Sequence, residues 1–80
     1  MRVKIFVSLK GGVLDPQGKA IEGSLHTLGY AEVQDVRMGK YLEFKFEASS
    51  REAAESRIRE MCEKLLANPV IEDYRFEIEG

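Results

Sequence analysis

The stretch Leu65-Leu66-Ala67-Asn68-Pro69-Val70-Ile71-Glu72-Asp73-Tyr74 decides how the second half of this chain folds. The two leucines close an apolar helical stripe. Asn68 belongs to the residue types that tolerate the left-handed conformation ending many helices, and Pro69 cannot continue a helix. The valine and isoleucine that follow open a run with high β-propensity. The stretch therefore predicts a helix end followed directly by a strand.

The residues on both sides of this junction extend the same pattern. Upstream, Ser49-Ser50-Arg51-Glu52 is typical of a capping box, with Ser49 as the cap. An amphipathic helix is predicted after it, because apolar residues recur at helical spacing: Ala54, Ile58, Met61, Cys62 and Leu65. Downstream, residues 70 to 78 alternate like a half-buried strand, with Tyr74, Phe76 and Ile78 facing inward.

The first half of the chain predicts a strand, a helix and two more strands. Residues 2 to 10 alternate, with Phe6 as one outward apolar exception. Asp15-Pro16 is a strong helix start. The apolar stripe of that helix consists of Ile21, Leu25 and Leu28. Residues 33 to 47 predict a pair of strands turning near Gly39.

The predicted order is β-α-β-β-α-β. Right-handed crossovers around a central hairpin then give an α+β, ferredoxin-like fold, with a four-stranded antiparallel sheet and two helices on one face. Eighty residues allow one domain, predicted to span residues 1–80. A core this small makes self-association an open possibility.

Composition excludes several classes of function. With 44% hydrophobic and 32% charged residues, the chain is typical of an ordinary globular domain. A net charge of −2 disfavours nucleic-acid binding. A single cysteine excludes an intramolecular disulfide. No apolar run is long enough to span a bilayer, and the N-terminus alternates like a strand rather than a signal peptide. We expect a cytoplasmic protein without membrane or nucleic-acid partners.

The chemistry-bearing residues predict no catalytic site, no metal site and no cofactor. His26 is expected on the surface of a helix, and Cys62 on the apolar face of another. An RNA-recognition sheet needs outward aromatics on two strands, and only Phe6 and Tyr41 qualify. An acylphosphatase-like enzyme needs an arginine in the loop after the first strand, where this chain has Lys10-Gly11-Gly12. That glycine-rich loop leaves three interpretations open: a flexible connection, an anion site, or a docking loop.

Four segments resemble one known family in order and spacing: Leu9 to Gly18, Leu28-Gly29-Tyr30, Val36 to Lys40, and Leu65 to Tyr74. Together they make the chain similar to the PurS family, the small subunits of phosphoribosylformylglycinamidine synthase. The resemblance implies a subunit without an active site of its own. In that family a glutaminase subunit releases ammonia, and a large synthetase subunit uses it with ATP. The small subunit, as a dimer, bridges the two and supports ammonia channelling.

The resemblance also implies partner contacts, which we expect at motif residues not needed for the core. The partners would be the glutaminase subunit, the large synthetase subunit and further copies of the chain, as a dimer or tetramer. Arg37 and Lys40 rank highest, because neither is needed for a cap or a turn. An alternative function is a dimeric small-molecule-sensing domain. The candidate contact residues are Lys10, Val13, Leu14, Asp15, Gln17, Arg37, Gly39, Lys40, Asn68, Pro69, Glu72 and Asp73.

Overall fold

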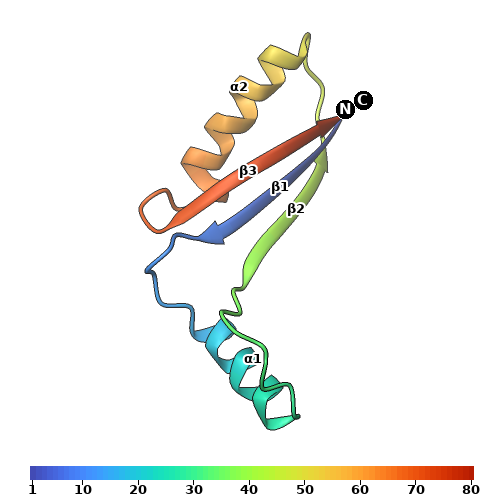
Figure 1. The fold of residues 1–80 in the computed structure, drawn as a ribbon. Coiled ribbons are helices and arrows are strands. Elements are labelled where there is room, and N and C mark those ends of the chain that lie inside the picture. Colours follow the sequence, from blue (N-terminus) through green and yellow to red (C-terminus); the bar gives the residue numbers. More distant parts are fainter.

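The computed structural model describes residues 1–80 as three strands and two helices, the second of which ends in a π-helical turn. Figure 1 shows their arrangement. In chain order the elements are β1 (Arg2–Leu9), α1 (Pro16–Thr27), β2 (Gly39–Lys45), α2 (Arg51–Met61), η1 (Cys62–Leu66) and β3 (Glu72–Glu79). Neither α1 nor α2 is long and apolar enough to cross a membrane.

The centre of the sheet is β1, which pairs antiparallel with β2 on one side and β3 on the other. The predicted alternation of β1 is confirmed, because Val3, Ile5 and Val7 are buried while Phe6 faces outward. Helix α2 covers the buried face of the sheet (Figure 1). The core consists of Val3, Ile5, Val7, Ala54, Ile58, Cys62, Ala67 and Ile78.

The predicted four-stranded ferredoxin-like sheet is wrong, because the sheet has three strands in the order β2-β1-β3. The missing strand is residues 33–38, which form no strand. Two backbone N–H groups of this segment, at Val36 and Met38, donate to carboxylates of the first helical region instead of to a neighbouring strand. Asp35 also has a left-handed φ of 55°, which interrupts an extended backbone.

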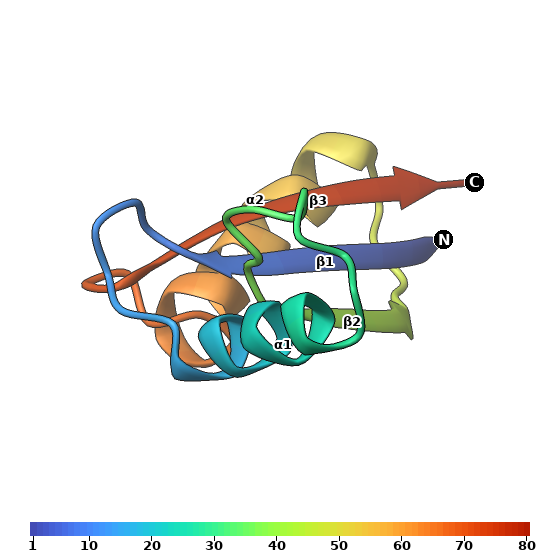
Figure 2. The same ribbon diagram turned by 60° about the horizontal axis from the view of Figure 1, so that its bottom comes forward.

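The expectation of two helices on one face of the sheet is also wrong. Helix α1 lies beyond one end of the sheet (Figure 1), and no α1 residue belongs to the core or packs against it. Figure 2, in which that end of the molecule comes forward, shows α1 in front of β2. The radius of gyration is 16.1 Å, whereas a compact 80-residue domain has about 12 Å. Helix α1 and its flanking segments, residues 10–38, therefore extend away from the rest of the chain.

The second helix starts and ends differently from the prediction. The N-cap is Ser50, not Ser49, and its Oγ accepts a hydrogen bond from the Ala53 N–H at 3.1 Å. The helix ends in η1, where the Ala67 N–H donates to the Cys62 carbonyl. This wider turn leaves Leu65 81% exposed and packs Leu66 against the core instead.

The turn after η1 also differs in detail from the prediction. Asn68 does not adopt a left-handed conformation. Its side-chain Oδ1 accepts from the Val70 N–H at 3.1 Å, and its carbonyl accepts from the N–H groups of Ile71 and Glu72. These bonds keep residues 68–71 in a turn, so β3 begins at Glu72 rather than at Val70.

Candidate functional site

The charged residues predicted to contact partners gather at one end of the sheet, which we call the sheet-end surface: Lys10, Arg37, Lys40, Glu72 and Asp73. Lys10 Nζ lies 3.5 Å from an Asp73 carboxylate oxygen, and Lys40 Nζ lies 3.8 Å from Glu72 Oε2. The Arg37 guanidinium donates to the Lys10 carbonyl at 3.1 Å. Segments far apart in the sequence thus present three cations and two carboxylates on one surface.

A cleft of about 260 Å³ lies within this surface. It brings together five of the predicted contact residues, and it is lined by Leu9, Asp15, Gln17, Met38, Gly39, Lys40 and Glu72. Glu72 is the most covered charge of the two ion pairs, with its side chain 16% exposed. Its Oε1 accepts from the Asn68 N–H, and Lys40 Nζ donates to the Leu66 carbonyl at 3.3 Å.

All but one of the remaining predicted contact residues are exposed or half-buried. Leu14 is 72% exposed, Val13 is half-buried, and Asn68 and Pro69 are exposed in the turn before β3. The exception is Asp15, which is only 5% exposed. Its two carboxylate oxygens accept hydrogen bonds from the N–H groups of Met38 and Gly18.

These two hydrogen bonds explain the electrostatics of Asp15. The Met38 N–H first, and the Gly18 N–H second, stabilise the ionised carboxylate and lower the pKa of Asp15 below its ordinary value. The carboxylate also caps α1, as the Asp15-Pro16 sequence predicts. The bond to Met38 was not predictable from local sequence, because it joins residues 23 positions apart.

Two apolar surfaces are uncovered, and sequence reasoning missed both. The first, which we call the apolar groove, has a volume of about 490 Å³ and lies between β2 and the second helical region; it is lined by Phe44, Phe46, Met61, Lys64, Leu65 and Leu66. The second is the α1 stripe, where Ile21 is 38% and Leu28 73% exposed. The spacing of apolar residues along the sequence predicted that the side chains of both surfaces face the core. Only the position of α1 shows that nothing in the chain covers them.

The outward face of the sheet carries a stacked row across all three strands. The Phe6 and Tyr41 ring centroids are 5.0 Å apart, and the Arg75 guanidinium carbon lies 3.9 Å from the Phe6 centroid. Phe6 is therefore already stacked on a cation from a neighbouring strand. Arg75 also forms an ion pair with Glu77 at 2.9 Å.

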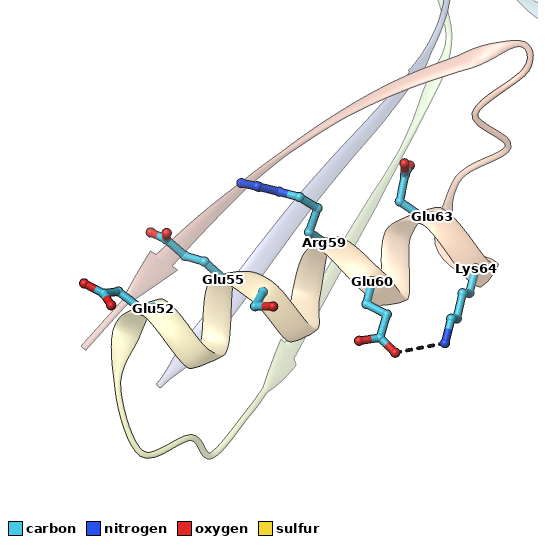
Figure 3. Close-up of a pocket in the computed structure, with 7 residues that line it drawn as sticks. Glu52, Glu55, Arg59, Glu60, Glu63 and Lys64 are labelled. Atoms are coloured by element: carbon cyan, nitrogen blue, oxygen red, sulfur yellow. Dashed lines mark hydrogen bonds and ion pairs between the residues drawn. The ribbon is translucent and has the colours of Figure 1, made fainter.

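The outer face of α2 is a charged, shallow hollow (Figure 3). Its side chains point in different directions along the helix rather than toward a common point (Figure 3). Lys64 pairs with Glu60 at 2.9 Å, and the Arg59 guanidinium lies 5.4 Å from the Phe76 ring centroid. This geometry is that of a solvated helix face with i,i+4 pairing.

The single histidine and the single cysteine have structural surroundings. His26 Nε2 lies 2.7 Å from the Val33 carbonyl oxygen, to which it can donate a hydrogen bond. Cys62 is fully buried in the core, and burial raises the pKa of its thiol. A raised pKa disfavours the thiolate that nucleophilic chemistry needs.

Comparison with known proteins identifies the family. Residues 2–80 match the sequence model of PurS, described as phosphoribosylformylglycinamidine (FGAM) synthase. The FGAM synthase subunit PurS of Bacillus subtilis is 59% identical over 98% of this chain and 92% of its own length. A crystal form of B. subtilis PurS superposes with a TM-score of 0.89 at 58% identity, covering 99% of this chain and 98% of that one.

A more distant structure agrees with this match. In the structure of PurLQS from Thermotoga maritima, a chain 34% identical to this one superposes with a TM-score of 0.86, covering 95% of this chain and 93% of that one. The family model and these relatives span nearly the whole sequence. The chain therefore belongs to the PurS family of FGAM synthase subunits.

Proposed function

We propose that this chain is a non-catalytic assembly subunit, which joins the glutaminase and large synthetase subunits of FGAM synthase and supports ammonia transfer between them. The PurLQS structure from T. maritima, with its similar chain, supports this role. A cytoplasmic location belongs to the same proposal.

The observation that carries the proposal is the pair of uncovered apolar surfaces. A small domain is stable only if it buries most of its apolar side chains. Here the α1 stripe and the apolar groove are both left open within one chain. Such surfaces are typical of proteins that complete their core by association.

We assign a second copy of the chain to the apolar groove. The groove lies on the α2 side of the sheet, alongside β2, where α1 would have to pack in order to cover Phe44 and Phe46. Helix α1 of the same chain lies beyond the end of the sheet (Figure 1). We propose that the same helix from a second copy packs its apolar stripe into the groove. Self-association then leaves the sheet-end surface available for the larger subunits.

The experiment that tests this assembly role mixes the chain with the two larger subunits and measures the mass of the complex by light scattering after gel filtration. We expect a complex containing all three polypeptides, and two or more copies of this chain. A glutaminase–synthetase pair that forms equally well alone, and never retains this chain, would contradict the proposal.

A matched pair of variants tests the surfaces. Leu28→Ser changes the α1 stripe, whereas Val70→Ser changes a side chain of similar exposure (80%) outside both apolar surfaces. We expect Leu28→Ser to shift the free chain toward monomer and Val70→Ser to leave its mass unchanged. Equal behaviour of the two variants would remove the α1 stripe from the interface.

A further inference from the structure

One side of α1 is tied to the segment that returns toward β2. Three side chains on the helix or its cap bind backbone groups of that segment. Asp15 accepts from the Met38 N–H at 2.7 Å and Glu22 accepts from the Val36 N–H at 3.2 Å. His26 Nε2 lies 2.7 Å from the Val33 carbonyl oxygen. The order 15, 22, 26 against 38, 36, 33 shows that the helix and the segment run antiparallel.

The backbones themselves approach closely along this seam. Gly18 is the one buried residue of α1, and a Cβ added there would collide with the Val36 carbonyl oxygen. By contrast, Gly23 on the same helix has no atom within 4 Å of such a Cβ. The close approach is therefore specific to the side of α1 that carries the three hydrogen-bonding residues.

We propose that Asp15, Glu22 and His26 form a latch that holds residues 15–38 as one rigid arm and so positions the α1 stripe for docking. This inference rests on the proposed function, because the arm matters only if the chain associates. These three are positioning residues: they act through the direction in which the arm presents Ile21 and Leu28, not by touching the partner.

The physical reason is preorganisation. A stripe on a loosely attached helix must be ordered when it docks, and that ordering weakens association. Hydrogen bonds to a carboxylate are the stronger kind, and Asp15 makes two from a position only 5% exposed. The latch also explains why the Asp15 side chain is buried although the residues around it are exposed.

Asp15→Asn separates the latch from the helix cap. Asparagine caps helices about as well as aspartate, but its amide NH2 replaces one of the two carboxylate oxygens, so that either the Gly18 or the Met38 N–H faces a donor instead of an acceptor. We expect the helix content to be unchanged and the dissociation constant for self-association to rise about tenfold or more. The backbone N–H of Met38 should also exchange with deuterium faster than in the wild-type chain.

Ser50→Ala is the matched control, because it removes the cap of α2 without touching the arm. We expect it to lower thermal stability while leaving the dissociation constant unchanged. A wild-type dimer whose dissociation constant is the same in Asp15→Asn overturns the latch alone. A wild-type chain that stays monomeric at every concentration overturns the self-association on which the latch rests.

Discussion

At the scale of single residues, Gly18 and Gly23 of α1 differ in the space around them, although glycine is a poor helix former at either position. Gly23→Ala should raise the free energy of unfolding by about 0.5–1 kcal/mol, because alanine is the better helix former and the site is open. Gly18→Ala should lower it by about 1–3 kcal/mol, since the new Cβ meets the Val36 carbonyl. Urea unfolding of both variants measures the difference, and equal effects would contradict the tight seam.

Asp15 gives the chain a defined pH dependence. Its folded pKa lies below the ordinary value of 3.8, because the N–H groups of Met38 and Gly18 stabilise the carboxylate. The folded state therefore binds fewer protons there than the unfolded state, and stability rises with pH in that range. The contribution should be complete above the ordinary value and lost as the pH falls through the lower, folded value.

The measurement compares urea unfolding of the wild-type chain and Asp15→Asn across an acid series. We expect the gap in stability between them to be widest near neutral pH and to shrink below pH 3.8. A gap that stays constant through this range would show that the carboxylate charge contributes nothing to the fold.

At the scale of elements, α2 and η1 divide their apolar residues between the core and the groove. Ile58 is fully buried, so Ile58→Ala should cost about 2–5 kcal/mol of stability at any protein concentration. Leu65 is 81% exposed in the single chain. If a second copy covers the groove, Leu65→Ala should cost little in dilute solution and more as the concentration rises.

Thermal melting of both variants over a hundredfold range of protein concentration distinguishes these cases. A Leu65→Ala effect that does not change with concentration would mean that the groove remains open in solution. The expected effect of Ile58→Ala would still hold in that case, because the core around Ile58 is complete within one chain.

Local sequence was sufficient to predict some of these elements but not others. The alternation of β1, the Asp15-Pro16 start of α1 and the apolar spacing from Ala54 to Cys62 follow from local sequence patterns and are confirmed, whereas Leu65, predicted on the same apolar stripe, is exposed. The predicted strand at residues 33–38 failed, because side chains from α1 take the N–H groups that a strand would use. That competition joins residues 14 and 23 positions apart, beyond the reach of any local pattern.

In the candidate site, too, local sequence predicts some features, and others depend on contacts between distant segments. The sequence predicted twelve contact residues, and the structure brings three of the cations among them, Lys10, Arg37 and Lys40, to one end of the sheet. It did not identify the apolar groove, because Phe44 and Phe46 alternate as core residues do. Both side chains pack against the core, and their other side is open because α1 does not lie over this face of the sheet.

At the scale of the whole molecule, the sheet-end surface is the proposed contact with the larger subunits. Arg37→Ala and Lys40→Ala should weaken capture of the chain by those subunits roughly tenfold or less, since exposed charges contribute modestly to affinity. Lys45→Ala, at the opposite end of β2, is the control and should bind normally. Titration calorimetry at two salt concentrations measures the effect, and equal binding by all three variants would remove these cations from the interface.

In the proposed role, this chain joins a source of ammonia to its consumer without doing chemistry itself. The most direct measurement is the rate of FGAM formation by the two larger subunits, with glutamine or with ammonium chloride as nitrogen donor, in the presence and absence of this chain. We predict that glutamine-dependent formation requires the chain, whereas ammonia-dependent formation by the synthetase proceeds without it. Glutamine-dependent formation at the same rate without the chain would contradict the account.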